Sequence, residues 1–377
     1  MGLRIVTTFG IEEEFLLMDR GTQLPATPAP QQAETLLAIA AGGGKATPEW
    51  LTCQLEHTSP VFSDAAMALE SLVSFRRELA AVAGSMGFDA AATGAAPDIA
   101  VAAAQITPGD RYHRLAGMSP AIAADQYLNG MHVHIGLDTL HDGVQALNGL
   151  RPWLPLVVAL GANSPIWRGS DSGFASWRSI HYRRWLANGI PPQFDSLADY
   201  RARLDALLRF DVVESPSTLA WLTRISFAHG TLEIRACDVQ LEAGDAVVIA
   251  LLIRALVRMA LDTPVLTRIP PELLEVATWQ SAKFGLSGSL MDPATGTQKP
   301  AADLLHETLE RLQPYFEGAE DRSVVQHGLE RVLSHGTGAE RQRRAMQGGG
   351  LSGLLTHAYA SLTARPDLPG VLPAARC

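Results

Sequence analysis

Four short segments of the chain alternate apolar and polar side chains, and this pattern limits what the chain can fold into. They are Phe9–Leu17, Trp50–Thr58, Asn129–Leu137 and Thr231–Asp238. Successive side chains of a β-strand point to opposite faces, so the alternation predicts four strands with one apolar and one polar face. Sheets that bury one face and leave the other polar are typical of antiparallel proteins.

The polar faces of these strands carry an unusual set of groups. Each strand contributes an i, i+2 pair, and the pairs are Glu12/Glu14, Gln54/Glu56, His132/His134 and Glu233/Arg235. Two carboxylates about 7 Å apart on one face repel each other unless a cation lies between them. Carboxylates with an occasional imidazole suit Mg²⁺ or Mn²⁺. The four pairs together predict a metal-assisted catalytic face, whereas Glu13 should point to the opposite side of its strand.

Each pair also has a simpler explanation. The three glutamates at 12–14 fit an exposed edge strand with solvated charges. His132 and His134 could be hydrogen-bonded histidines without a metal, and Glu233 with Arg235 could be a cross-strand ion pair. The recurrence of one design in four segments favours the catalytic face over four coincidences.

Composition and length predict a globular protein and disfavour several classes of partner and location. The chain has 377 residues, of which 47% are hydrophobic and 18% charged, so it can bury a sizeable core and should form one large domain or two tightly joined ones. A net charge of −9 disfavours nucleic acid as a partner. Three cysteines without C-x-x-C spacing, a start without a signal peptide and a longest apolar run of only Ala246–Ile253 predict a cytoplasmic protein that does not cross a membrane.

Helices should connect and follow the strands. Helical periodicity predicts helices over Gln31–Ala41, Ser63–Met86, Leu147–Ala162, Ser196–Phe210 and Ala246–Leu261, and two or three more within 301–360. Further strands are expected over Phe88–Thr93 and Thr218–Phe227. The segments 94–120 and 163–195 have little periodicity and should be loops. No P-loop, H-E-x-x-H or strand-linked G-x-G-x-x-G motif occurs.

Seven stretches, taken in order, match one known family. They are FGIEEEF, QLE at 54–56, GMHVHIGL, the run LRPWLPLVVALGANSPIWRGSDSGFASWR, GTLEIRACD, WQSAKFGLSGSLMD at 279–292 and GAERQRR at 338–344. Together they resemble the YbdK-type carboxylate–amine ligases, the bacterial branch of the glutamate–cysteine ligase type 2 family. The resemblance runs from about residue 9 to residue 345.

The resemblance implies an α+β protein with a glutamine-synthetase-like fold: a curved, mostly antiparallel sheet with helices on its outer face and a polar concave catalytic face. It implies one catalytic domain over 1–377 with a helical part at about 301–360. It also implies ATP, Mg²⁺ or Mn²⁺, an amino acid and an amine as small-molecule ligands, and is compatible with a homodimer. The family reaction converts a carboxylate, such as the glutamate γ-carboxyl, into an acyl phosphate, which the amine then attacks.

Carried over position by position, the resemblance also implies roles for single residues. Five residues correspond to metal ligands, namely Glu12, Glu14, Glu56, Glu233 and His134. His132 is the second candidate imidazole on the nucleotide side. Arg235 corresponds to the arginine at the transferring phosphoryl group, and Arg178 with Trp177 would hold the substrate carboxylate or phosphate. Lys283 stands where the family has the arginine of W-x-x-x-R, so it keeps the charge but loses the planar fork.

Two other functions remain compatible with these residues. A metal-dependent hydrolase or phosphatase could use the same carboxylates without ATP. A non-catalytic homologue could retain the fold and bind nucleotide only. Amine-dependent release of ADP would separate the ligase from both.

Overall fold

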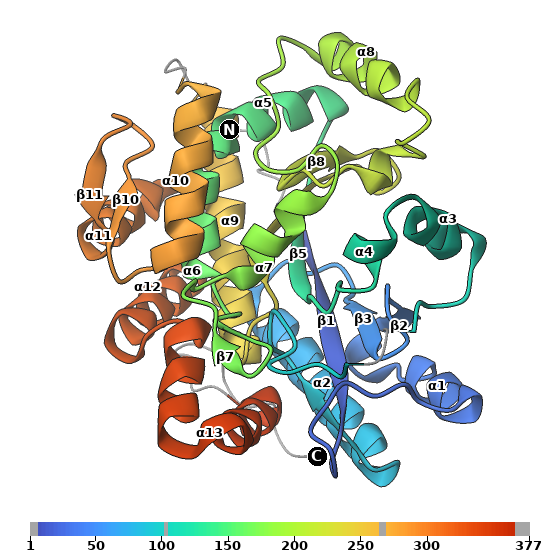
Figure 1. Ribbon diagram of the computed structural model, residues 1–377. Helices are drawn as coiled ribbons and strands as arrows, with labels where there is room; N and C mark the ends of the chain where they lie inside the picture. Colours follow the sequence, from blue (N-terminus) through green and yellow to red (C-terminus); the bar gives the residue numbers. More distant parts are fainter. Residues whose placement is uncertain (1–6, 102–104, 264–268, 366–377) are drawn as a thin grey trace.

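A seven-stranded antiparallel sheet forms the centre of the molecule (Figure 1). This computed structural model describes residues 7–101, 105–263 and 269–365. The strand order is β2 (Lys45–Pro48), β3 (Gln54–Thr58), β1 (Phe9–Asp19), β5 (Gly130–Gly136), β9 (Thr231–Asp238) and β8 (Thr223–Ser226), while β4 (Phe88–Ala91) pairs with the second half of β1. All pairings are antiparallel, as the one-sided alternation predicted.

Helices cover the apolar face of the sheet. The main ones are α2 (Ala65–Ser85), α5 (Leu140–Leu150), α6 (Leu154–Leu160) and α9 (Ala243–Asp262). Three of the predicted apolar strand positions, Ile11, Val133 and Ile234, are buried in one cluster with side chains from these helices. Burying this surface is the main favourable term in folding, about 25 cal/mol per Å² of apolar area. The predicted α+β class is therefore confirmed.

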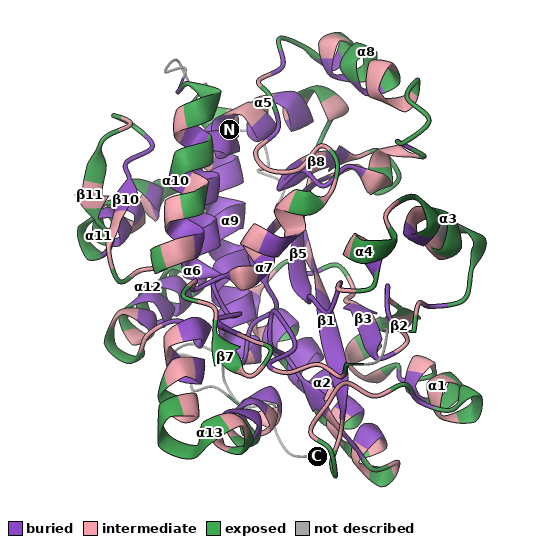
Figure 2. Ribbon diagram, in the orientation of Figure 1, coloured by how far each residue is buried: buried purple, intermediate pink, exposed green. Residues whose placement is uncertain are grey.

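Helix α9 is buried along nearly its whole length (Figure 2). Its two arginines mark it as a packed helix, because each finds an acidic partner. Arg254 pairs with Asp321 and donates to the carbonyl of Ser63 at 2.8 Å, and Arg258 pairs with Glu317 at 2.9 Å. Among the described residues, no helix has the length and apolar character needed to cross a membrane.

The remaining elements surround this core. They are α1 (Pro30–Leu37), α3 (Asp110–Met118), α4 (Pro120–Ala123), β6 (Ile166–Trp167), β7 (Ser170–Asp171), α7 (Trp177–His181), α8 (Leu197–Leu208), α10 (Pro271–Phe284), β10 (Ser289–Met291), β11 (Gln298–Pro300), α11 (Ala301–Leu312), α12 (Ala319–His335) and α13 (Gly338–Thr363), with short 3₁₀ turns between some of them. The helices expected within 301–360 are α11 to α13, and α13 is kinked at Gly350.

Several sequence predictions were wrong in their boundaries; the strand expected over Thr218–Phe227, for example, extends only over Thr223–Ser226. The helix expected over 147–162 begins at Leu140, where Thr139 and Asp142 form a capping box, and Pro152 divides it into α5 and α6. The strand expected from Trp50 begins at Gln54, after a turn. The segments expected to be loops contain regular elements: α3 and the start of α4 lie in 94–120, and β6, β7 and α7 lie in 163–195. Short capped helices of this kind lack a periodic stretch long enough to detect.

The buried side chain of His57 should make the stability of the folded protein depend on pH. Its ring is buried on the helix side of β3, stacks on Phe75 at 3.8 Å between ring centroids, and has no hydrogen-bond partner for either nitrogen among the described residues. Burial, with Arg76 nearby, lowers the pKa of His57 to about 3 from 6.5. The folded state therefore binds this proton less readily than the unfolded chain. The contribution of neutral His57 to the free energy of unfolding is therefore fully present above about pH 6.5 and is lost as the pH falls from 6.5 towards 3.

We expect His57→Phe to flatten the decline in unfolding free energy between pH 6.5 and 4, because the variant has no imidazole to protonate. Denaturant unfolding of both proteins across this range measures the difference. His113→Phe, at an exposed histidine of α3, is the matched control. A wild-type slope in His57→Phe would contradict the assignment.

Candidate active site

The register of the sheet brings the predicted polar pairs together. Glu14 lies opposite Glu56 in the β1–β3 pairing, and Glu12 lies opposite His132 in the β1–β5 pairing. In the β5–β9 pairing His134 lies opposite Glu233. Residues up to 221 positions apart in the chain (233 − 12) thus meet on one face of four adjacent strands.

Two clusters with the composition of metal sites share one imidazole. In the first, ligand atoms of Glu12, His132 and Glu233 all lie within 4.8 Å of one another, and in the second the same holds for Glu14, Glu56 and His132. The Nδ1 atom of His132 is 3.0 Å from Glu12 Oε2, and its Nε2 atom is 3.6 Å from Glu14 Oε1. The structure therefore places His132 between both clusters and His134 at the edge of the first.

Electrostatics show a surplus of negative charge around Glu56. Burial, together with the carboxylates of Glu49, Glu12 and Glu14, raises the pKa of the Glu56 carboxyl well above its usual value. Burial also raises the pKa of Glu12, but hydrogen bonds and charge from His132 and His134 outweigh it and hold the pKa far below its usual range. A cation in the second cluster would relieve the repulsion that Glu56 experiences.

The first cluster is already balanced by arginines. Arg224 of β8 donates to both oxygens of Glu233, at 2.6 and 3.0 Å, and Arg235 donates to the same carboxylate. Burial raises the pKa of Glu233, but Arg235 and Arg224 outweigh it and hold the pKa at about 2. Sequence reasoning missed Arg224, although its place in the alternating stretch Thr223–Ser226 puts it on the polar face. Arg235 also donates to the hydroxyl of Tyr182 at 3.3 Å.

A bulge in β9 determines where Arg235 points. Met131 pairs with Cys237 and Val133 pairs with Ile234, so two residues of β9 oppose the single residue His132. Such bulges bend a strand and redirect its side chains, often beside active sites. Arg235 lies at this irregularity and lines the cavity next to Glu14 and His132.

Arg178 reaches the same region from outside the sheet. Its side chain is buried, lies 5.4 Å from the centre of the Tyr182 ring and crosses the backbone of Gly130, where a Cβ atom would lie 2.4 Å from Nη2. A larger residue at position 130 would have to displace the Arg178 guanidinium, whereas glycine accommodates it where it lies. The amide of Gly130 also donates to Glu14 at 2.5 Å. The glycine that opens GMHVHIGL thus lets Arg178 lie beside the carboxylates.

Two predicted ligand-binding residues lie elsewhere. The Trp177 ring packs against Phe174 and His181, and the Lys283 ammonium lies 4.6 Å from the centre of the Phe174 ring. Neither residue lines the cavities that border the carboxylates. Gln54, the polar partner of Glu56 in β3, has a structural role. Its side-chain amide donates hydrogen bonds to Leu128 O and Asn129 Oδ1 at 2.7 and 3.0 Å.

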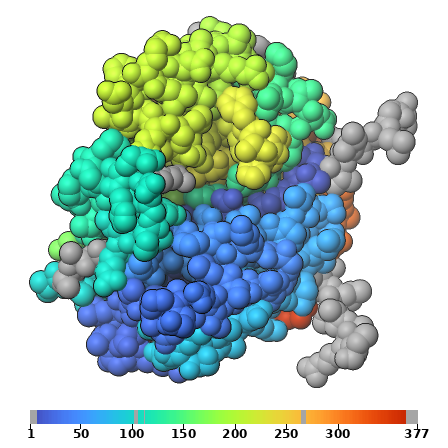
Figure 3. All heavy atoms as spheres, turned by 90° about the vertical axis from the view of Figure 1, so that its right-hand side faces the viewer, coloured from blue at the N-terminus to red at the C-terminus, as the bar shows by residue number. Residues whose placement is uncertain are grey.

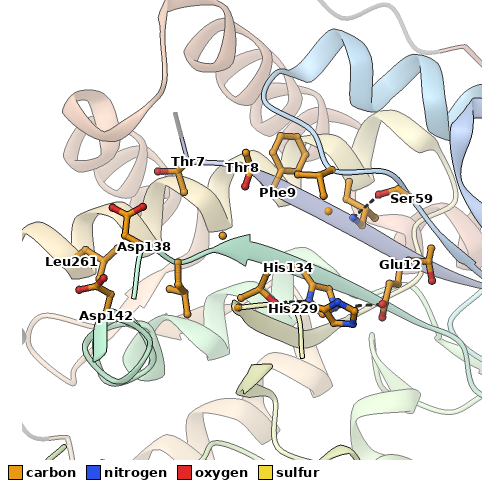
Figure 4. Close-up of a pocket in the computed structure, with 18 residues that line it drawn as sticks. Thr7, Thr8, Phe9, Glu12, Ser59, His134, Asp138, Asp142, His229 and Leu261 are labelled. Carbon is orange, nitrogen blue, oxygen red and sulfur yellow. Dashed lines mark hydrogen bonds and ion pairs between the residues drawn. The ribbon is translucent and has the colours of Figure 1, made fainter. Parts of the chain in front are cut away.

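A large cavity opens on the Glu12 side of the clusters. This Glu12 cavity has a volume of about 610 Å³ and lies between the first turns after β3, β5 and β8. Figure 4 shows His134 and His229 side by side near Glu12, with Asp138 and Asp142 at the far end. His134 bonds to Thr231 Oγ1 at 2.8 Å, and its Nε2 atom is 3.4 Å from Glu12.

A smaller cavity lies on the opposite side of the clusters. This Glu14 cavity has a volume of about 150 Å³, and its lining includes Glu14, His132, Arg178 and Arg235. Three aromatic rings also line it, and Trp50 lies edge-on to both Tyr112 and Trp185. Figure 3 shows the open side of the molecule as a hollow between the blue N-terminal residues and the yellow-green residues around α8.

Comparison with known proteins shows the family to which this chain is similar. The sequence profile of glutamate–cysteine ligase family 2 matches residues 8–358. A protein of Nocardia farcinica, named provisionally as glutamate–cysteine ligase 2-1, is 38% identical over 344 residues, which cover 90% of this chain and 88% of that protein. A provisionally named glutamate–cysteine ligase 2 of Salinispora tropica is 37% identical over 363 residues, which cover 95% of each chain.

The fold is also found in a solved structure. Glutamate–cysteine ligase of Francisella tularensis in complex with AMP superposes with a TM-score of 0.68, covering 97% of this chain and 91% of that one at 13% identity. Sheet, helices and sequence together define an ATP-dependent carboxylate–amine ligase with a glutamine-synthetase-like fold. The chain belongs to glutamate–cysteine ligase family 2. The resemblance drawn from the seven sequence stretches is confirmed.

Proposed function

We propose that this enzyme phosphorylates the side-chain carboxylate of an amino acid, with L-glutamate the first candidate, and joins the resulting acyl group to an amine. The observation that carries the proposal is the position of the carboxylate–imidazole clusters between two cavities of unequal size. A two-substrate phosphoryl transfer needs such an arrangement, because donor and acceptor must approach one another in line.

The size of the cavities supports their assignment. The Glu12 cavity of about 610 Å³ suits a nucleoside triphosphate, and no P-loop is needed because the clusters can face the phosphates. The Glu14 cavity of about 150 Å³ suits the acid, and Arg178 and Arg235 supply its positive charge. Planar guanidinium groups match carboxylate and phosphoryl oxygens.

The donor set fits divalent cations of the Mg²⁺ or Mn²⁺ type. The first cluster offers Glu12, His132 and Glu233, and the second offers Glu14, Glu56 and His132. The Nε2 atoms of His132 and His134 are buried and have no hydrogen-bond partner within the described parts of the chain, and Glu56 lies among like charges. His132 is the stronger ligand candidate, and His134 then faces the nucleotide. Bound cations would neutralise the phosphate charge that repels the incoming carboxylate.

The protein's own groups would then carry out three tasks. Arg178 and Tyr182 hold the acid so that a carboxylate oxygen faces the γ-phosphorus, whose bond to the β–γ bridging oxygen breaks as ADP leaves. Arg235 donates to the oxygens of the transferring phosphoryl group, while Arg224 keeps Glu233 ionised and oriented. The amine nitrogen attacks the acyl carbon, the bond to phosphate oxygen breaks, and the amide forms with loss of one proton from nitrogen.

The proposal is tested by ADP release with Mg²⁺-ATP and L-glutamate, with and without a panel of amines that includes cysteine. We expect release of ADP to depend on the amine and to match the amount of amide formed. Hydroxylamine provides a second readout, because it converts an acyl phosphate to a hydroxamate and phosphate.

Absence of both ADP and hydroxamate with every acid tested would contradict the proposal. Turnover of phosphoesters without nucleotide would instead identify a metal-dependent hydrolase. Binding of nucleotide without any turnover would identify a non-catalytic homologue.

A further inference from the structure

A side groove with a mainly apolar lining lies next to the Glu14 cavity. It has a volume of about 310 Å³ and lies where α3 and α4 approach the segments on either side of α8. Its lining is Leu115, Met118, Ser119, Arg184, Trp185, Leu186, Val212, Val213, Thr218 and Leu219. Leu115, Trp185 and Thr218 also line the Glu14 cavity, so the two spaces adjoin and share these side chains.

Three large apolar side chains around this groove are exposed. Met118, Leu186 and Val212 are 44%, 52% and 53% accessible. Single exposed apolar residues are common, but several around one concavity mark a place where an apolar ligand can recover burial free energy. In Figure 3 the segments that carry them, in teal and yellow-green, meet at the rim of the hollow.

Among the described residues that line the groove, none carries a carboxylate, and the one cation is Arg184. Its guanidinium is engaged with Asp125 at 3.4 Å and with the ring of His181 at 2.7 Å, so this part of the chain offers no free charge to an ionic group. The Thr218 hydroxyl donates to Ser215 O. A cavity of about 440 Å³ also borders Arg178 and Tyr182, but Arg183, Glu272 and Glu275 line it, so an apolar group would gain less there.

We propose that the amine substrate carries an apolar alkyl or aryl group, and that this group occupies the side groove. The inference rests on the proposed ligase function. The nucleotide occupies the Glu12 cavity, and the acid fills the small Glu14 cavity between the arginines. Of the two spaces that adjoin the acid, the side groove is the more apolar, so the amine approaches the acyl carbon past Trp185 and Leu115. Its nitrogen attacks that carbon, phosphate leaves with the electron pair of the broken C–O bond, and the substituent stays in the groove.

The test compares amines of similar length with Mg²⁺-ATP and L-glutamate. We expect kcat/KM for phenethylamine and butylamine to exceed that for ethanolamine and cysteine by at least about tenfold, as hydrophobic pockets typically discriminate. The double variant Leu186→Ser, Val212→Ser should lose this preference. Its kcat/KM for butylamine, divided by its kcat/KM for ethanolamine, should be about tenfold lower than in the wild type. Val276→Ser, at an equally exposed apolar residue of α10, is the matched control and should keep the ratio.

Binding provides a readout that does not need turnover. Trp185 lies in the wall that both spaces share, so phenethylamine should change tryptophan fluorescence saturably, and Trp185→Phe should remove the change. Hydroxamate formation without any preference for apolar amines would overturn the groove assignment and leave the ligase intact. Equal fluorescence titrations by phenethylamine and ethanolamine would overturn it even if no turnover is found. A preference for apolar acids with small amines would assign the groove to the acid and overturn the proposal.

Discussion

Replacing Glu56 by glutamine is expected to stabilise the metal-free protein and to remove its activity. Glu56 lies among Glu49, Glu12 and Glu14, and these charges with burial raise its pKa well above 4.5. A neutral amide of the same shape removes this repulsion, worth on the order of 1–2 kcal/mol for charges partly screened by solvent. Turnover should fall at least about 100-fold, because the second cluster loses a charged ligand.

The two effects have separate measurements. Denaturant unfolding in EDTA should show the gain in stability at pH 7, and the gain should disappear below about pH 4.5, where Glu56 is protonated in both states. The rise in melting temperature caused by Mg²⁺ should be smaller in the variant. Glu78→Gln, at an exposed glutamate of α2, is the control. A less stable apo variant, or one with full activity, would contradict the proposed cluster.

Replacing Glu13 by glutamine is expected to have the opposite effect on stability. Glu13 points to the helix side of β1, as the alternation predicted, but there it forms a fully buried pair with Arg76 of α2, with contacts of 2.6 and 3.1 Å. Removing one partner of a buried ion pair leaves an uncompensated charge and costs about 3–5 kcal/mol. Activity per folded molecule should stay close to wild type, because Glu13 does not reach the polar face.

Arg76→Met should be at least as destabilising. Arg76 also donates to the carbonyls of Gln240 and Leu241, at 2.9 and 3.0 Å, so the variant leaves two buried acceptors without their partner. Unfolding free energies of Glu13→Gln, Arg76→Met and the double variant give the coupling between the two side chains. Additive single effects would contradict the pairing. Loss of kcat in folded Glu13→Gln equal to that in Glu12→Gln would contradict the strand-face assignment.

The sequence predicted much of this site because strand geometry is local. A period of two fixes which side chains share a face, so Glu12 and Glu14 were separated from Glu13 without knowledge of any partner strand. The same period identified His132, His134, Glu233 and Arg235. Helices with long amphipathic stretches, such as α2, were predicted to within two residues at each end. Trp177 and Lys283 were placed in the site by motif alone, and the structure packs both of them around Phe174 instead.

The features that depend on pairing between distant segments, such as strand register, could be determined only from the tertiary structure. Register placed His132, rather than His134, between both carboxylate clusters, and a one-residue shift would have turned these groups into the core. The bulge opposite His132, the arginine clamp on Glu233 and the contact between Arg178 and Gly130 join parts of the chain that carry no local signal of one another. Alternation is a property of each strand alone and can be read from its residues. The order and register of the strands follow from long-range packing, and they determine which of the exposed polar groups meet.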